Sequence, residues 1–243
     1  MNIACWSGPR NLSTAMMYAF GARSDCAVWD EPFYAAYLAA TGLDHPMRAE
    51  ILAAGETDAD AVAARCAAPP EGRRHVYQKH MTHHMIAGIG RGWFGAVTHV
   101  FLIRHPARVL ASYERKRENP VLADIGFVQQ AGIFDAVTAA GHLPVVIDSA
   151  DVRAAPEAML RALCAAIGLG FDPAMLSWPP GGHPDDGIWA AHWYGAVHAS
   201  TGFAGPEGPL PVLSPGLEAV CAAAMPHYAR LKAHALAPAE DAP

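Results

Sequence analysis

The sequence predicts an α/β fold in three layers, with helices on both faces of a mostly parallel five-stranded sheet. Short apolar runs, typical of buried strands, alternate along the chain with segments whose apolar residues recur at helical spacing. The 243 residues are 52% hydrophobic and 16% charged, which is typical of a compact domain with a full core. We therefore expect one domain over residues 1–237, with strands at residues 3–6, 25–29, 74–79, 99–103 and 143–147.

The first strand leads into a turn that suits an anion. After residues 3–6, the polar turn SGPRNLST passes into a helical run that begins near Leu12. A strand, a glycine-containing turn and a helix N-terminus in this order direct backbone N–H groups and the positive end of a helix dipole toward one point. The turn is a candidate phosphate or sulfate site. The alternative is an ordinary βα turn, with Gly8 and Pro9 as its breakers.

The same turn lacks the lysine of nucleotide-binding loops with the pattern G-x-x-x-x-G-K-[ST]. Counted from Gly8, the lysine position falls on Thr14 and the metal-binding hydroxyl on Ala15. One residue earlier, the two positions fall on Ser13 and Thr14. Arg10 is the strong cation of the turn, and its planar guanidinium suits an anion with several oxygens. The pattern favours anion binding without the usual ATP and Mg²⁺ chemistry.

Two carboxylates follow the second strand. Pro32 cannot continue a strand, and it disfavours a helical backbone conformation at the preceding residue, Glu31. Asp30 and Glu31 are therefore expected in extended backbone at the end of the strand. In parallel sheets such exits line the crevice where ligands bind, which makes Glu31 a candidate general base. A solvated acidic turn is the alternative. The Ala-rich segment that follows is expected to be helical, with breaks at residues 42–46 and 69–70.

Histidines cluster after the third strand, at His80, His83 and His84. On a helix, His80 and His84 would share one face at the i, i+4 spacing seen in zinc sites. No carboxylate or cysteine lies within the next turn to complete such a site, so we expect no metal. We interpret the three histidines as one functional residue and two structural residues, in preference to a metal site.

The fourth strand, residues 99–103, is the clearest buried strand and ends at Arg104. Pro106 suits the first position of the helix that follows. Arg104, Arg108 and Ser112 are expected on related faces. An arginine and a hydroxyl beside the first turn can hold a second phosphate.

Apolar residues at helical spacing predict the remaining helices. These are expected at residues 107–116, 124–140, 156–167 and 215–236. The charged run at residues 115–117 is expected to form an exposed, salt-bridged face. The helix at 124–140 is expected to point Val128 inward, together with Ile125, Ala131 and Phe134. The tail, residues 238–243, is expected to be disordered.

A long irregular segment, residues 178–215, is rich in Pro, Gly, Trp and His. Such a stretch inside a compact domain is usually a lid or a substrate loop. Its aromatic residues either cover an apolar acceptor or stack on an adenine, or they form a satellite core beneath the loop. They are Trp189, Trp193, Tyr194 and Phe203.

Bulk properties exclude several classes of protein. A formal net charge of −6 gives no support for non-specific nucleic-acid binding. Five widely spaced cysteines without a CxxC pair are typical of reduced thiols in a cytoplasmic protein. No run approaches 18 apolar residues, and the N-terminus has no signal-peptide pattern, so we expect no membrane association. The sequence indicates no particular oligomeric state.

Three segments, in order, resemble the sulfotransferase family, whose members use 3′-phosphoadenosine 5′-phosphosulfate (PAPS). The turn at residues 8–14 is similar to the family's 5′-phosphosulfate loop, P-[KR]-S-G-[ST]-T. Arg10 stands at its Lys/Arg position, and Ser13 and Thr14 stand at its hydroxyl positions. Leu12 replaces the glycine of that loop.

The second segment, FLIRHPARVLASYERK, resembles the family's 3′-phosphate motif, with Arg104 after a buried strand and Ser112 eight residues later. The third, residues 145–172, is similar to the family's strand, acidic turn, Pro-Glu helix and Gly-Leu ending. The C-terminal Arg-Lys-Gly loop of many members has no recognisable counterpart in this sequence. The resemblance implies a fold like that of the P-loop nucleoside-triphosphate hydrolases.

The resemblance implies in-line transfer of a sulfuryl group from PAPS to a hydroxyl or amine of a small-molecule acceptor, without a metal. Glu31 is the favoured base, because several branches place a glutamate after this strand; His80, near the Lys-x-His position of the soluble branch, is the other candidate. Arg10 is expected to stabilise the transferred group. The residues implied to bind PAPS are Gly8, Pro9, Arg10, Asn11, Leu12, Ser13, Thr14, Arg104 and Ser112. The alternative functions are a P-loop-type nucleotide-dependent phosphotransferase and a non-catalytic nucleotide-binding protein.

Overall fold

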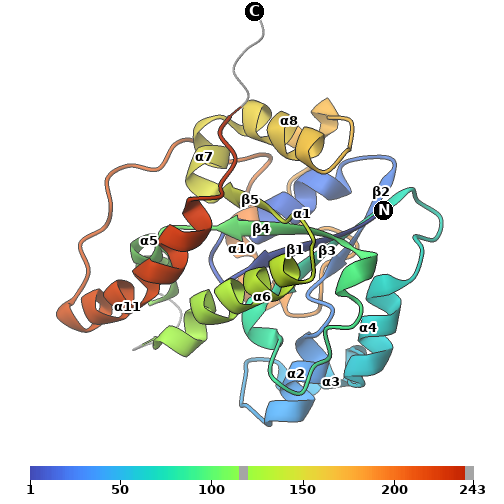
Figure 1. Cartoon of the computed structure of the whole chain (residues 1–243), viewed down its shortest axis with the longest axis horizontal. Coiled ribbons are helices and arrows are strands. Elements are labelled where there is room, and N and C mark those ends of the chain that lie inside the picture. The colour runs from blue at the N-terminus through green and yellow to red at the C-terminus, as the bar shows by residue number, and fades with distance from the viewer. Residues whose placement is uncertain (115–119, 239–243) are drawn as a thin grey trace, which may run out of the picture.

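The computed structural model describes residues 1–114 and 120–238 (Figure 1). Its sheet has the order β2-β3-β1-β4-β5, and every neighbouring pair of strands is parallel. Helices cover both faces, so the predicted three-layer α/β fold is confirmed. The strands are β1 (Asn2–Ser7), β2 (Cys26–Asp30), β3 (His75–Met81), β4 (Thr98–Ile103) and β5 (Val145–Asp148).

The two faces of the sheet carry separate cores, because successive strand residues point to opposite sides. Ile3 and Cys5 of β1 pack in one core with α1 (Ser13–Gly21) and α8 (Pro156–Ala166). Ala4 and Trp6 pack in the other core. That second layer contains α4 (Ala59–Ala67), α6 (Phe127–Ala139) and α11 (Pro215–Lys232).

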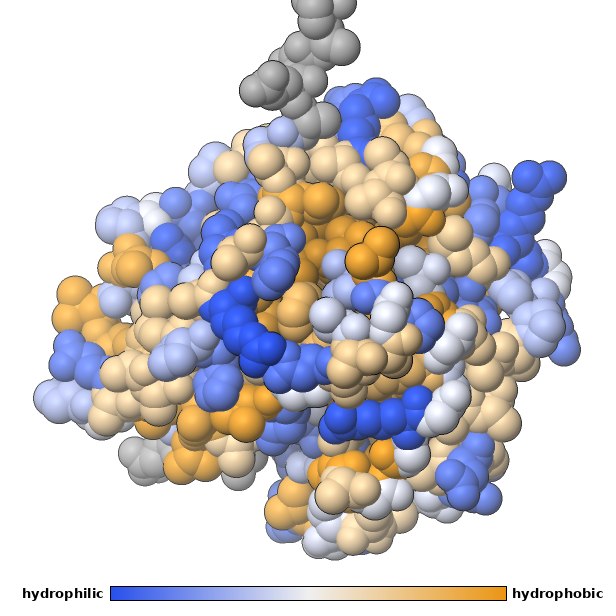
Figure 2. All heavy atoms as spheres, viewed as in Figure 1, coloured by the Kyte–Doolittle hydropathy of each residue, from blue (hydrophilic) through white to orange (hydrophobic). Residues whose placement is uncertain are grey.

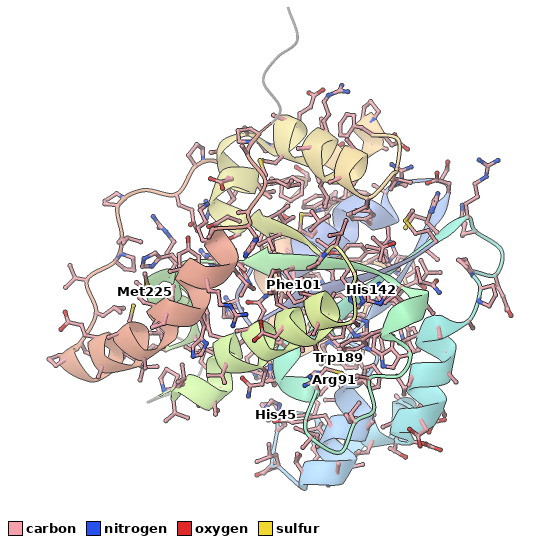
Figure 3. The ribbon with its side chains drawn as sticks, viewed as in Figure 1. His45, Arg91, Phe101, His142, Trp189 and Met225 are labelled. Atoms are coloured by element: carbon pink, nitrogen blue, oxygen red, sulfur yellow. The ribbon has the colours of Figure 1, made fainter. Side chains whose placement is uncertain are left out.

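The core between the sheet and α6 is visible at Phe101 of β4 (Figure 3). The Phe101 ring meets the Phe134 ring edge to face, with 5.4 Å between their centroids. On the outer surface of the same side, hydrophilic residues are spread between apolar ones (Figure 2). Within the described ranges, no helix of the protein has the length and apolar character needed to cross a bilayer.

Shorter helices connect these layers to the carboxyl ends of the strands. They are α2 (Tyr34–Thr41), α3 (Arg48–Ala54), α5 (Pro106–Tyr113), α7 (Ser149–Ala154), α9 (Ala190–Trp193) and α10 (Gly195–His198). Four 3₁₀ turns complete the described elements: η1 (Thr82–His84), η2 (Phe94–Ala96), η3 (Leu122–Ile125) and η4 (Pro173–Leu176). The segment predicted as a lid contributes only α9 and α10 as regular structure.

Some predicted boundaries are wrong for local reasons. The helix expected at residues 124–140 is divided by Gly126, whose φ of 71° interrupts it between η3 and α6. Val128 is consequently exposed, because residues before and after the break do not share one helical face. The last helix ends at Lys232, earlier than expected. The charged face predicted at residues 115–117 lies outside the described residues, as does most of the predicted tail.

Candidate active site

A cavity of about 330 Å³ lies at the carboxyl ends of β1, β3 and β4, beneath the segment that carries α9 and α10. The chain crosses from one side of β1 to the other here, and such a switch point is the usual ligand crevice of an open α/β sheet. The cavity brings together most of the residues predicted to form the site. Its wall includes Pro9, Arg10, Asn11, Leu12, Ser13, Thr14, Glu31, Arg104 and Ser112.

The turn between β1 and α1 curves around one end of this cavity. Leu12 is the N-cap of α1 and has a φ of 64°, and Arg10 has a φ of 59°. Leu12 thus adopts the left-handed conformation that the family's glycine would adopt without strain. The side chain of Leu12 makes no cap hydrogen bond, and the first turn of α1 has no acidic residue. The helix N-terminus is therefore suited to an external anion.

Gly8 and Asn11 hold the turn in place. A Cβ on Gly8 would lie 2.5 Å from the carbonyl oxygen of Ile125, so only glycine permits this approach of two backbones. Gly8 does not line the cavity. Asn11 is buried, and its Nδ2 donates a hydrogen bond to the carbonyl of Leu102 in β4. Gly8 and the Asn11 amide therefore shape the turn.

Arg10 and Arg104 join the two predicted anion subsites. The Nε of Arg10 donates to the Oγ of Ser112 at 3.0 Å. The Nη1 of Arg104 donates to the carbonyl of Arg10 at 2.6 Å. The Nε of Arg104 and the Oγ of Ser149, both buried, have no hydrogen-bond partner within the described residues. Polar groups of this kind in a cavity wall are ready to bind a ligand's oxygens.

Further arginines gather around Arg104. Arg108 of α5 and Arg153 of α7 both form ion pairs with the carboxylate of Glu207, as Arg104 does. Arg153 also lines the cavity. The cluster therefore concentrates positive charge at the end of β4, next to the turn.

At the other end of the cavity, Glu31 follows β2 and has a φ of 42°. Its Oε1 accepts a hydrogen bond from the Nζ of Lys79 at 2.7 Å and lies 3.2 Å from the hydroxyl of Tyr194. Burial raises the pKa of Glu31; Lys79 opposes this rise, and the charge of Asp30 adds to it. A carboxylate that titrates closer to neutral pH is better suited to general base catalysis.

Lys79 is shared by two carboxylates. Its Nζ donates to Glu31 and, at 2.9 Å, to Oδ1 of Asp30. Burial alone would lower the pKa of Lys79, but the charges of Asp30 and Glu31 raise it above its ordinary value. Lys79 therefore stays charged and holds Glu31 in a fixed position.

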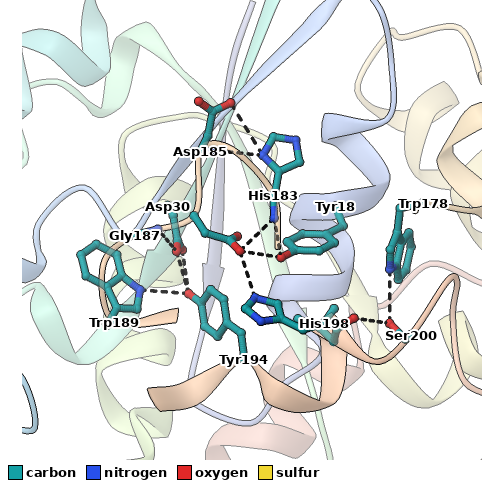
Figure 4. Close-up of polar contacts among 12 residues, drawn as sticks. Tyr18, Asp30, Trp178, His183, Asp185, Gly187, Trp189, Tyr194, His198 and Ser200 are labelled. Carbon is teal, nitrogen blue, oxygen red and sulfur yellow. Dashed lines mark hydrogen bonds and ion pairs between the residues drawn. The ribbon is translucent and has the colours of Figure 1, made fainter. Parts of the chain in front are cut away.

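The loop segment is tied to this group through Tyr194 (Figure 4). The Tyr194 hydroxyl donates to Asp30 at 2.8 Å and accepts from the indole Nε1 of Trp189 at 3.0 Å. The backbone N–H of Gly187 donates to Oδ2 of Asp30 at 3.0 Å. Trp189 and Tyr194 are buried in a core with α2, against which Trp193 also packs, and this agrees with the alternative of a satellite core. Trp193 and Tyr194 also line the cavity.

His80 is not in the cavity, and the prediction that it could act as the base is not supported by its position. β3 continues to Met81, so His80 points to the opposite face from Lys79. Its ring stacks on Trp6 with centroids 4.5 Å apart. Burial, with a smaller contribution from His99, lowers the pKa of His80 to about 3. His80 is a neutral core residue.

The expected helical face of His80 and His84 does not form, because His80 is in β3 and His84 is in η1. His83 and His84 line the cavity, where the His84 ring stacks on Tyr34 with centroids 4.7 Å apart. Over residues 1–114 and 120–238, no three His, Cys, Asp or Glu side chains are grouped to hold a metal ion.

Several residues of the site were not predicted. Lys79 was assigned only to the end of a strand, although Asp30 and Lys79 are register partners in neighbouring parallel strands. Arg153 lies in the third segment that carried the resemblance, and its basic charge was a usable signal. Glu207 gave no signal, because its loop has neither periodicity nor a motif.

Comparisons with known proteins agree with this geometry. A family model described as "Sulfotransferase domain" matches residues 1–235. The branched-chain-amino-acid aminotransferase-like proteins 1 and 2 of Arabidopsis thaliana are 37% and 36% identical to the chain over 205 residues, or 84% of it. The chain spans only 37% and 36% of the length of these two relatives.

Two solved structures share the fold. A sulfotransferase domain from the curacin biosynthetic pathway has a TM-score of 0.55 and 16% identity, covering 91% of this chain and 96% of that one. A sulfotransferase domain from the Synechococcus PCC 7002 olefin synthase has a TM-score of 0.50 and 18% identity, covering 91% and 93%. With the family model matching nearly the whole chain, the protein belongs to the sulfotransferase domain family.

Proposed function

We propose that the protein is a sulfotransferase that moves a sulfuryl group from PAPS to a hydroxyl or amine of a small-molecule acceptor. One observation carries the proposal: a single cavity contains an anion-binding turn, an arginine cluster and a buried carboxylate. The two proposed anion subsites would take the two ends of a doubly phosphorylated donor, and the buried carboxylate would take the acceptor's proton. Family membership supports the reaction class.

The residues present fit PAPS. The turn at residues 9–15 would hold the 5′-phosphosulfate, since it presents the N-terminus of α1 and the side chain of Arg10. Arg104 and Ser112 would hold the 3′-phosphate, and the unpaired Nε of Arg104 and Oγ of Ser149 would supply further hydrogen bonds. Arg153 would add positive charge there, where the chain lacks a recognisable Arg-Lys-Gly loop.

The chemistry that follows is in-line displacement at sulfur. Glu31 takes the proton of the attacking hydroxyl or amine, whose lone pair forms the new bond to sulfur. The bond from sulfur to the 5′-phosphate oxygen breaks, and that oxygen keeps the electron pair. Arg10 and the N–H groups of the turn stabilise the developing charge, at about 3–4 kcal/mol for each well-placed donor.

The acceptor side of the cavity is largely aromatic. Tyr34, His84, Tyr113 and Trp193 are among the residues that line the cavity. Flat, apolar walls with one buried carboxylate suit a small molecule with an apolar or ring-containing body and one hydroxyl or amine. The five cysteines, all free, agree with a reducing compartment such as the cytoplasm.

The donor is tested by calorimetric titration with adenosine 3′,5′-bisphosphate and, separately, with ADP and Mg²⁺. We expect the bisphosphate to bind much more tightly, and formation of this product from PAPS in the presence of an acceptor mixture. Preferential binding of ADP with Mg²⁺, together with ATP turnover, would instead favour the P-loop-type phosphotransferase. Tight binding of the bisphosphate without transfer to any acceptor would favour a non-catalytic nucleotide-binding protein.

A further inference from the structure

The loop before α11 places an acidic side chain inside the arginine cluster. The Glu207 side chain is only 3% exposed, although its neighbours in the loop are open to solvent. Its Oε1 lies 3.0 Å from Nη1 of Arg153 and contacts Nη2 of Arg104, and its Oε2 lies 2.9 Å from Nε of Arg108. Three guanidinium groups thus converge on one carboxylate.

This arrangement has the chemistry of an occupied phosphate site. Among the described residues, three arginines bind one monovalent carboxylate here, which leaves an excess of positive charge in the cluster. A phosphate carries up to two negative charges and more acceptor oxygens, so it matches three guanidinium forks better than a carboxylate does. Arg104, which holds Glu207, also holds the backbone of the anion-binding turn through the carbonyl of Arg10. Glu207 and a bound phosphate would therefore use the same guanidinium group, that of Arg104.

The loop is built so that Glu207 can leave without breaking the fold. No backbone–backbone hydrogen bond links residues 204–213 to the rest of the described chain. Phe203 packs against one core and Leu213 against another, which anchors the two ends of the loop. Between them, side chains of the cluster hold the loop: Arg153 donates to the carbonyl of Gly205 at 2.9 Å, and Arg108 donates to that of Gly208. Replacement of Glu207 by a phosphate on these arginines would therefore release the loop.

We propose that Glu207 is an intramolecular surrogate for the donor's 3′-phosphate, an autoinhibitory contact that a 3′-phosphorylated nucleotide must displace before it binds fully. The inference rests on the proposed function, because it takes the arginine cluster as the 3′-phosphate subsite. Displacement frees residues 204–212 and couples donor binding to movement of the loop. When the site is empty, Glu207 neutralises part of the cluster and keeps other anions out.

The expected size of the effect follows from population arithmetic. A nucleotide that needs the open state binds with an apparent affinity reduced by the fraction of molecules that are open. Minor states of this kind are populated at about 10% or less. Removing the carboxylate should therefore tighten binding of a 3′-phosphorylated nucleotide by about tenfold or more.

The test compares wild type with Glu207→Gln, which keeps the shape of the side chain and removes its charge. Calorimetric titration with adenosine 3′,5′-bisphosphate should show binding tighter by about tenfold or more, while adenosine 5′-phosphate should bind both proteins equally. Glu218→Gln, an exposed glutamate at the start of α11, is the matched control and should behave as wild type. Equal or weaker binding of the bisphosphate by Glu207→Gln would overturn the proposal, because this result would mean that Glu207 only stabilises the loop.

A second measurement does not depend on folding of that variant. A nitroxide label at Leu210→Cys, in a Cys221→Ser background, reports motion of the otherwise native loop, since Leu210 is half exposed and the other four cysteines are buried. We expect addition of adenosine 3′,5′-bisphosphate to increase the label's mobility, and a decrease or no change on binding would refute the release of Glu207.

Failure of the proposed function gives a different result. If neither protein binds the bisphosphate, titration with sodium sulfate tests the arginine cluster alone. Sulfate bound by Glu207→Gln and not by wild type would support Glu207 as an anion surrogate while contradicting PAPS as the donor. No difference with either anion would refute the inference itself.

Discussion

Replacing Lys79 by methionine should destabilise the protein, and by more at pH 8 than at pH 5. Lys79 is 1% exposed and is the cation between Asp30, at 2.9 Å, and Glu31, at 2.7 Å. Methionine fills a similar volume but leaves two buried carboxylates without their cation. Breaking a buried pair in this way costs about 3–5 kcal/mol, because the remaining charge is not compensated.

The direction of the pH dependence comes from Glu31. Its pKa is already raised by burial and by Asp30, and loss of Lys79 raises it further. A carboxyl group whose folded-state pKa is above its unfolded value favours the folded state at low pH, and this contribution is lost as pH rises through the folded-state pKa. At pH 5 the variant's carboxyl can keep its proton, whereas at pH 8 it must ionise without a partner.

Urea denaturation at the two pH values measures the effect. Arg230→Met is the control, since Arg230 pairs with Asp135 on the surface, where the two side chains are 51% and 47% exposed. Water screens such a pair, so the control should lose about 1 kcal/mol or less. A Lys79→Met variant with the control's small loss, or with a loss that does not change between pH 5 and pH 8, would refute the reasoning.

Three further predictions concern the site. Glu31→Gln should lower kcat by about 10²–10⁴-fold in a sulfuryl-transfer assay while leaving calorimetric binding of adenosine 3′,5′-bisphosphate near normal, and unchanged kcat would exclude Glu31 as the base. His80→Gln should keep kcat within the same order of magnitude, because His80 lies outside the cavity; an inactive but folded variant would restore it as a candidate. Gly8→Ala should lower the Tm and weaken bisphosphate binding together, because a Cβ there meets the carbonyl of Ile125.

The parts of the fold that depend on local pattern were predictable. The five predicted runs correspond to five parallel strands, because most of them were short, apolar and followed by a helical segment. The site followed from the same pattern, since the carboxyl ends of parallel strands share one edge of the sheet. This is why the turn after β1, Glu31 after β2 and Arg104 after β4 line one cavity.

His80 shows why the rest was not predictable. The third strand was expected to end at Lys79, with a helical segment after it, but it continues for two more residues. Side chains alternate along a strand, so Lys79 and Met81 line the cavity while His80 enters the core beneath Trp6. An error of two residues in a strand boundary thus moved a candidate base to the wrong face. Glu207 is a different case, because its partners Arg104 and Arg153 are set by tertiary structure alone.

Costs to stability are concentrated where ligands are expected to bind. Of the four non-glycine residues with positive φ in the described chain, Arg10, Leu12 and Glu31 all line the cavity. Strain of this kind costs about 1–3 kcal/mol for each residue and persists only where the surroundings enforce it. Here, backbone contact at Gly8, the Asn11 bond to β4 and the Lys79 ion pairs enforce it. A plain α/β scaffold gains nothing from strained turns beside buried charges, so their coincidence in one cavity argues for ligand binding over packing as their cause.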